Sequence, residues 1–458
     1  MTIQTAVRTL SGALGDRLVT SEAVRAHHGR DESYYPAMLP DAVAFPGSTE
    51  EVAEIVKICA ADRCPIIPWG VGTSLEGHAL AVQGGVTLDL SRMNQVLEVA
   101  QADMLAVVQP GVTREALNAH IRDTGLFFPV DPGANATLGG MASTRASGTN
   151  AVRYGTMRDN VLAAEVVLAD GRVIRVGTRA RKSSAGYDLK NLFVGSEGTL
   201  GIFTELTVKL HGVPEQITAA TCAFDTVEGA IAAAIQTVQM GVPVARMEFM
   251  DEISVRACNA YAKTDLPEKP HLFLEFHGTE AGAAEQAQTF GDIAEEHGGQ
   301  GFRWTANAEQ RAALWKARHN MYFAGLALAP GHRAVSTDVC VPISRLAEAL
   351  LTARRDIDES PIMGNLLGHV GDGNFHAGLL VHPDRPEDLA EAKRLSGKWN
   401  LLALELGGTI TGEHGIGMGK KAWMTAEHGE AWGIMADLKR TLDPQNILNP
   451  GKLVEING

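Results

Sequence analysis

Apolar runs alternate with amphipathic stretches along the first half of the chain. Residues 43–70 predict a strand, a turn, a helix and a second strand, and Ser48 or Thr49 is expected to cap the helix. The same order follows downstream, with Thr113 expected to cap another helix. Two apolar runs then flank Asp170-Gly171, a strong signal for a β-hairpin. The pattern predicts a first domain of mixed strands and helices.

The pattern changes near Gln216. Residues 216–251 predict a strand, a helix and a strand, and residues 271–299 predict a strand followed by a long helix. Such units can build one antiparallel sheet with helices on one face, which is an α+β arrangement. We therefore expect three parts: a first domain over 1–215, a middle domain over 216–430 and a C-terminal segment over 431–458.

Composition and charge exclude some classes of protein. The 458 residues are 45% hydrophobic and 21% charged, as in an ordinary globular protein. A formal net charge of −14 argues against a nucleic-acid partner, which needs a basic face.

The cysteines and the apolar segments indicate the cellular compartment. Five scattered cysteines indicate reduced thiols. The N-terminus lacks the pattern of a secretory signal, and no stretch approaches the ~20 apolar residues of a membrane span. We expect a cytoplasmic protein whose membrane association, if any, is peripheral.

Three stretches of the first half are rich in small residues. Residues 68–80 follow an apolar strand without the G-x-G-x-x-G spacing of a dinucleotide fold, so their backbone could hold a diphosphate or could form only a turn. Residues 131–161 have neither helical nor strand period, and so much small-residue backbone favours packing on a large planar cofactor with a pyrophosphate tail. Residues 194–205 form the third stretch.

Two later stretches place candidate metal ligands among glycines. In "GHVGDGNFHAG" a turn sequence separates His369 from His376, which predicts a strand, a turn and a strand that bring the imidazoles together. In "GTITGEHGIGMGK" Glu413 could add a carboxylate, completing half a shell for a divalent metal. His414 would point to the opposite side in an extended backbone. For each histidine taken alone, a hydrogen-bonded structural role is the better interpretation, and the glycine-rich turns that they share favour a site.

Several motifs, in one order, resemble a known family: "PVDPGA", "ASGTNAVRYGTMRDNV", "FVGSEGTLG", "STDVCVPISRL", "GHVGDGNFH", "TGEHGIGMGK" and "LDPQNILNPGK". They are similar to the FAD oxidoreductases of the vanillyl-alcohol oxidase (PCMH-type) superfamily, in the D-2-hydroxy-acid dehydrogenase branch that includes cytochrome-linked D-lactate dehydrogenases of mitochondrial type. The resemblance implies an α+β fold. Its parts are a two-subdomain PCMH-type FAD-binding domain, a ferredoxin-like substrate domain and a C-terminal segment that returns to the flavin.

The resemblance also implies the cofactor site. FAD is expected to be noncovalent, although some relatives attach it through a histidine near the position of His78. The residues implied to contact it are Pro68, Trp69, Gly70, Val71, Gly72, Thr73, Ser74, Gly77, Pro132, Gly139, Gly140, Ser143, Thr144, Ala146, Gly148, Glu197, Gly198, Gly201, Ile202 and Asn449.

For the chemistry, the resemblance assigns His369, His376 and Glu413 to a zinc or manganese ion. His414 is the implied general base, and Arg318, His369 and His414 are the implied substrate contacts. The implied reaction oxidises D-lactate to pyruvate with hydride transfer to the flavin. Glycolate or D-2-hydroxyglutarate stays an alternative, but no second cation stands near Ser336, which favours a monocarboxylate.

The expected partners are a small 2-hydroxy acid and an electron acceptor such as a cytochrome, a quinone or an electron-transfer flavoprotein. A homodimer is left open. Two other classes compete: a metal-dependent hydrolase built on the same ligands, and a noncatalytic flavin-binding subunit of a larger redox complex. The hydrolase leaves the small-residue stretches unexplained, and a carrier subunit needs neither Arg318 nor His414.

Overall fold

The computed structural model describes residues 2–456, apart from the side chains of Ala317 and His319. The chain forms two compact units. Unit 1 contains the residues up to Ser147, then Gly155–Val213 and the segment from Glu413 onward. Unit 2 contains Gly148–Tyr154 and Pro214–Gly412.

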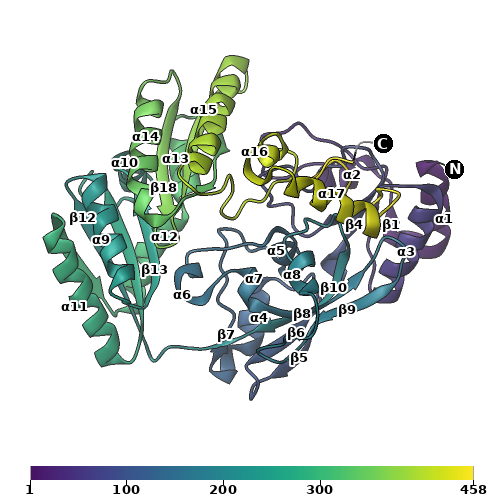
Figure 1. Cartoon of the computed structure of the whole chain (residues 1–458), viewed down its shortest axis with the longest axis horizontal. Coiled ribbons are helices and arrows are strands. Elements are labelled where there is room, and N and C mark those ends of the chain that lie inside the picture. The colour runs from purple at the N-terminus through teal and green to yellow at the C-terminus, as the bar shows by residue number, and fades with distance from the viewer. Residues whose placement is uncertain (1, 457–458) are drawn as a thin grey trace. The chain divides into compact units, whose positions relative to one another are not determined.

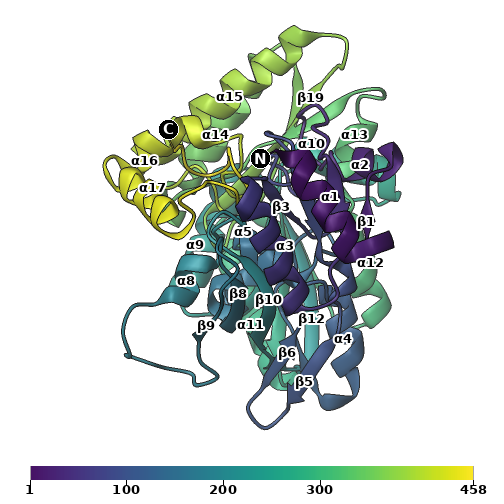
Figure 2. The ribbon, with the colours of Figure 1, turned by 90° about the vertical axis from the view of Figure 1, so that its right-hand side faces the viewer.

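Unit 1 begins with a small mixed sheet. Its strand order is β1 (Leu18–Val19), β2 (Ala42–Ala44), β4 (Val86–Asp89) and β3 (Ile66–Trp69), and β4 runs parallel to both of its neighbours. Helix α1 (Ile3–Leu14) packs beside α3 (Thr49–Asp62), as Figure 2 shows. The Ser48 hydroxyl accepts a hydrogen bond from the Glu51 amide, so the expected cap of α3 is confirmed.

A second, antiparallel sheet completes the core of unit 1. Its order is β5 (Val96–Ala100), β6 (Leu105–Val108), β10 (Ile202–Lys209), β8 (Val161–Val167) and β9 (Val173–Gly177). The β8–β9 hairpin turns at Gly171, whose φ of 79° requires glycine, so the predicted hairpin is confirmed. Besides short 3-10 turns, the described part of this unit also contains α2 (Glu22–His28), α4 (Arg114–Ile121), β7 (Leu126–Phe127), α5 (Leu138–Thr144), α7 (Met157–Asn160), α8 (Leu189–Phe193), β11 (His211–Gly212), α16 (Met424–His428) and α17 (Ala431–Leu442).

Unit 2 is built on one antiparallel sheet (Figure 1). Its order is β15 (Gly299–Thr305), β12 (Gln216–Phe224), β14 (His271–Gly278), β13 (Val244–Met250), β18 (Met363–His369), β19 (Asn374–Val381) and β16 (Arg333–Ser336), with β17 (Val339–Cys340) also paired to β19. The helices are α6 (Ala151–Tyr154), α9 (Val227–Gln239), α10 (Glu252–Ala262), α11 (Glu280–Glu296), α12 (Ala308–His319), α13 (Met321–Ala327), α14 (Leu346–Asp358) and α15 (Pro386–Glu405). The predicted α+β class and the antiparallel sheet are confirmed.

The helices of unit 2 cover both faces of this sheet, so the expectation of one covered face is wrong. Successive side chains of β14 point to opposite faces. The ring of Phe276 lies 6.3 Å from the ring of Phe290 on α11. Phe273 packs instead into a cluster with Val255 of α10 and Trp315 of α12. The face that carries Phe273 also carries the charged side chains of β13, because Glu248 pairs with Phe273 across the strands.

The units divide the chain differently from the expected domains in two regions, residues 148–154 and residues 413–430. The expected boundary at 215 lies close to the division after Val213. Residues 413–430, which the sequence places in the middle domain, group with unit 1. The reason is that the buried carboxylate of Glu197 accepts hydrogen bonds from the amides of Ile416 and Gly417.

Candidate metal and flavin site

Two adjacent strands of unit 2 bring the candidate histidines together. His369 ends β18, His376 lies on β19, and the register pairs Leu367 with His376. The two imidazole rings have centroids 5.4 Å apart. The turn between the strands contains Gly373 at a φ of 79°, where an added Cβ would also collide with the carbonyl oxygen of Val341. The predicted strand, turn and strand are confirmed.

Hydrogen bonds fix the orientation of both rings. Nδ1 of His369 lies 2.6 Å from a carboxylate oxygen of Glu248, and Nδ1 of His376 lies 3.0 Å from the carbonyl oxygen of Thr337. An acceptor at Nδ1 holds the proton there and directs Nε2 to an ion, as the outer partners of metal-binding histidines commonly do. In each ring, Nε2 is therefore the atom suited to a metal.

Glu248 connects the first histidine to the candidate substrate arginine. It has no exposed surface, and its second carboxylate oxygen lies 2.6 Å from a terminal nitrogen of Arg318, which is also buried. Burial favours the protonated acid, but the charges of His369 and Arg318 outweigh it and hold the pKa of Glu248 below its usual value. Glu248 was not expected from the sequence. Its signal was the alternation of charged Arg246 and Glu248 with apolar residues along β13.

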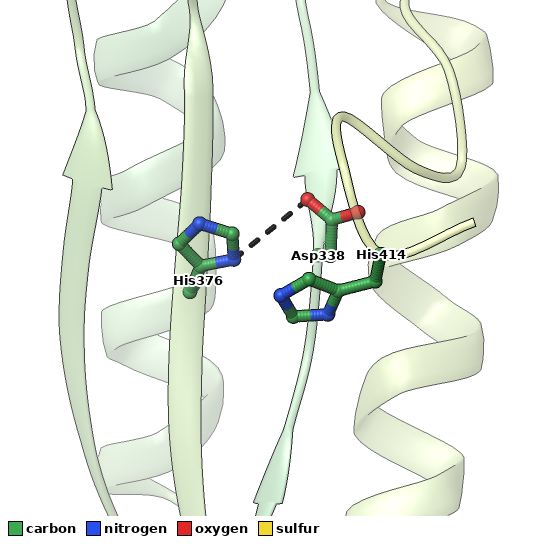
Figure 3. A group of neighbouring side chains, drawn as sticks. All are labelled: Asp338, His376 and His414. Carbon is green, nitrogen blue, oxygen red and sulfur yellow. Dashed lines mark ion pairs between the residues drawn. The ribbon is translucent and has the colours of Figure 1, made fainter. Parts of the chain in front are cut away.

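Two overlapping groups of side chains could each hold an ion. Ligand atoms of His369, His376 and Glu413 lie within 4.8 Å of one another, and so do those of Asp338, His376 and His414. Figure 3 shows the second group, in which an oxygen of Asp338 lies 3.7 Å from Nδ1 of His376. Two imidazoles and one carboxylate suit a borderline divalent cation such as Zn²⁺ and are also used for Mn²⁺. The donor set of the first group therefore fits the implied metal.

Asp338 also fixes the backbone that leads to Glu413. One of its carboxylate oxygens accepts hydrogen bonds from the Thr411 hydroxyl at 2.6 Å and from the Gly412 amide at 2.9 Å. The other accepts from the side-chain amide of Asn374 at 2.7 Å. Asp338 was not expected from the sequence, where it is a single acidic residue between two short strands.

The three small-residue stretches of unit 1 converge. An added Cβ on Gly70 would stand 2.5 Å from the Thr137 hydroxyl, at the cap of α5. The Glu197 amide donates to the carbonyl of Ser143 at 2.8 Å. Gly198, with a φ of 69°, packs on the ring of Pro68. The sequence suggested one shared ligand for these stretches, and their close approach supports it.

The loop after β3 fits a diphosphate. In the part of the chain that the structure describes, the backbone amides of Val71, Gly72, Thr73 and Ser74 have no protein acceptor. These residues are exposed or partly exposed. A row of such amides next to glycines is the kind of backbone that binds phosphate oxygens without a lysine. The residues present therefore fit an FAD diphosphate.

Other residues implied for FAD have structural contacts of their own. The hydroxyls of Ser143 and Thr144 donate to backbone carbonyls one turn back in α5. Gly139 packs on Pro110, and Gly201 on the side chains of Val166 and Phe193. Packing alone accounts for glycine at these two positions. Pro132, Ala146 and Ile202 lie in the same unit, and Gly77 is followed at once by the buried His78. Gly148 is grouped with unit 2.

Asn449 holds two of the stretches together. Its side-chain amide donates to the carbonyls of His78 and Glu197, at 3.1 and 2.8 Å. The side chain of Glu197 binds the backbone of the Gly415–Gly417 turn. Any contact of these two residues with FAD stays a prediction.

Comparison with known proteins identifies the family. Residues 40–177 match the FAD binding domain model, and residues 213–453 match the model of the C-terminal domain of FAD linked oxidases. A probable mitochondrial D-lactate dehydrogenase of Danio rerio is 49% identical over 99% of this chain and 92% of its own. A mitochondrial D-lactate dehydrogenase [cytochrome] of Arabidopsis thaliana is 45% identical over 98% of this chain and 80% of its own.

A solved structure shares the fold. The crystal structure of p-cresol methylhydroxylase with substrate bound superposes with a TM-score of 0.80, over 98% of this chain and 96% of that chain, at 18% identity. This confirms the predicted PCMH-type fold.

The comparison also corrects the expected compartment. The relatives above are named as mitochondrial, which contradicts the expectation of a cytoplasmic protein. Within residues 2–456, no helix has both the length and the apolar character that a membrane crossing requires. The two domain models and the two full-length relatives agree: the chain belongs to the family of FAD-linked D-lactate dehydrogenases.

Proposed function

We propose that this chain oxidises D-lactate to pyruvate, with FAD and a divalent metal held by His369, His376 and Glu413. The observation that carries the proposal is the group of these three side chains, which shares His376 with the group that contains His414. In a flavin-dependent family, a metal beside a histidine suits the removal of two hydrogens from an alcohol.

Arg318 is the proposed partner of the substrate carboxylate. One of its terminal nitrogens pairs with Glu248, and its buried Nε has no hydrogen-bond partner among the described residues. A buried guanidinium donor without an acceptor is costly, and a carboxylate would satisfy it. Glu248 thus aligns Arg318 and His369 at the same time.

His414 is the proposed base. It would take the proton of the substrate hydroxyl at a ring nitrogen, a step typically worth ~10²–10⁴-fold in rate. A divalent metal, when bound, would lower the pKa of that hydroxyl. Bound FAD supplies the acceptor for the hydrogen at C2. Because Glu413 and His414 are adjacent in sequence, a metal ligand and the base share one short backbone segment.

The surroundings favour a small monocarboxylate. Thr337 uses its hydroxyl to accept from the Ala377 amide and its carbonyl to orient His376. The other charged side chain of β13, Arg246, already has partners: Nε donates to Asn150 at 2.9 Å, and the guanidinium lies 4.7 Å from the ring centre of Trp315. The second carboxylate of D-2-hydroxyglutarate would therefore have to compete with these partners for Arg246.

The acceptor of the electrons is proposed to be a cytochrome, as the name of the Arabidopsis relative states for that protein. A quinone or an electron-transfer flavoprotein is the alternative outcome. Stopped-flow reoxidation of the reduced enzyme by each acceptor class separates them.

The decisive test is anaerobic bleaching of the purified yellow protein with D-lactate, L-lactate, glycolate and D-2-hydroxyglutarate, each with and without chelator. D-lactate should bleach the flavin fastest, and the chelator should slow the reaction. His414→Ala should keep the flavin spectrum and lose nearly all bleaching. A colourless protein would favour a hydrolase, and a yellow protein that no hydroxy acid reduces would favour a carrier subunit. Either result would refute the proposal.

A further inference from the structure

The glycine turn after His414 wraps around two buried charged residues of unit 1. The amides of Ile416 and Gly417 donate to the two carboxylate oxygens of Glu197, at 2.7 and 2.8 Å. An added Cβ on Gly415 would stand 2.7 Å from the Glu197 carboxylate and 2.8 Å from Nε2 of His78. Glycine is therefore required at 415 by close approach as well as by its φ of 81°.

Glu197 and His78 form a buried ion pair. Nε2 of His78 lies 3.2 Å from a carboxylate oxygen of Glu197, and the two side chains are 6% and 2% exposed. Burial opposes both charges. The negative charge of Glu197 nevertheless raises the pKa of His78. The charge of His78 and the two amides lower the pKa of Glu197. A paired carboxylate that accepts two amides makes strong, directional hydrogen bonds.

Nothing in the chemistry proposed above uses this pair. A contribution to stability does not explain the pair, because buried ion pairs are commonly no more stabilising than apolar residues of the same size. The pair instead orients the backbone, because both carboxylate oxygens of Glu197 bind the segment that follows His414. Glu197 also has a positive φ of 56°, which is unusual outside glycine.

We propose that Glu197 and His78 are positioning residues that fix the Glu413–His414 segment for metal binding and proton transfer. Asp338 fixes the start of the segment through the Gly412 amide, and Glu197 fixes its end through Ile416 and Gly417. Only three residues, Glu413 to Gly415, stand between the two attachments. This inference rests on the proposed function, because it assigns Glu413 to the metal and His414 to the base.

The direct test is amide hydrogen exchange, which needs neither substrate nor turnover. In the wild type, the peptide that contains Ile416 and Gly417 should exchange slowly, because both amides are bonded to a buried carboxylate. In Glu197→Gln, one charged acceptor becomes a neutral amide of the same size, and exchange of that peptide should accelerate at least ~10-fold. His78→Gln should give the same change in smaller degree.

Metal affinity is the second readout. Manganese titrated calorimetrically into chelator-treated Glu197→Gln should bind ~10–100-fold more weakly than to the wild type, as when outer partners of metal ligands are changed. The matched control is Asp356→Asn. Its buried carboxylate holds Lys398 and the Trp399 indole between α14 and α15, so the substitution loses a similar buried acceptor. Exchange of the 412–420 peptide and manganese affinity should be unchanged in this control.

Because Glu197→Gln and His78→Gln act on one pair, their effects on affinity should be strongly non-additive. Retained affinity and exchange protection in Glu197→Gln, or equal losses in Asp356→Asn, would overturn the inference. A wild type that binds no manganese, or whose bleaching ignores chelator, would instead defeat the proposed function. If Glu197→Gln does not fold, His78→Gln carries the same comparison.

Discussion

Replacing Glu248 should lower both the stability of the protein and its affinity for the metal. Replacing it with glutamine keeps the volume but removes a charge that contacts His369 and Arg318, each at 2.6 Å, from a position without exposed surface. Removing one partner of a buried ion pair costs ~3–5 kcal/mol. For a unit of about 200 residues, ~2–4 °C per kcal/mol predicts a fall in melting temperature of about 6–20 °C.

The same substitution should weaken metal binding, since it removes the acceptor that orients His369. The expected loss is ~10–100-fold in manganese affinity. Differential scanning fluorimetry and calorimetric titration measure the two effects on one preparation.

Glu275→Gln is the matched control for this experiment. Glu275 lies on the next strand of the same sheet, is also buried, and also contacts a histidine and an arginine: His277 at 2.7 Å and Arg246 at 3.6 Å. It should lower the melting temperature without changing manganese affinity. If Glu248→Gln bound manganese like the wild type, or if both variants lost affinity equally, the assigned role of Glu248 would be wrong.

Three further outcomes are expected. Arg318→Lys should raise KM for D-lactate ~10-fold or more and lower kcat less, because lysine lacks the planar fork; steady-state kinetics with an artificial dye measures this, and an unchanged KM would remove Arg318 from the site. Gly373→Ala should destabilise the chain by ~1–3 kcal/mol, through its positive φ and the collision with Val341, as urea unfolding would report, whereas Gly433→Ala, a helical position with open space around it, should not. The pKa values of Glu197, Glu248 and Glu275 are lowered in the folded state, so the stability they contribute is present above about pH 5 and is lost as pH falls through their folded values; a urea midpoint that held constant down to about pH 3 would contradict this.

The sequence predicted those parts of the site that depend on local pattern. The turn between His369 and His376 has its own glycine chemistry, so the hairpin could be derived before any long-range contact was known. Ser48 and Thr113 cap their helices for the same local reason.

Residues that act across strands were not predictable in this way. Glu248 faces His369 only because β13 pairs with β18, more than a hundred residues later in the chain. The hydrogen bonds of Glu197 were not predictable for a similar reason, because its carboxylate binds a turn 219 residues downstream. The prediction that helices cover one face of the unit 2 sheet was also wrong. It was derived from residues 216–299, where the pattern is clearest, and α12 and α13 come after them.

The short excursion of residues 148–154 into unit 2 limits how this enzyme can be recombined with its relatives. Asn150 binds Arg246, Arg153 donates to the carbonyl of Pro243, and Tyr154 bonds to His277 at 2.7 Å. A chimera that exchanged only 214–412 would leave this heptapeptide facing a foreign strand. Module swapping intended to alter substrate range therefore has to carry two separate stretches of gene, and lineages that diversified by such exchange would have had to move both together.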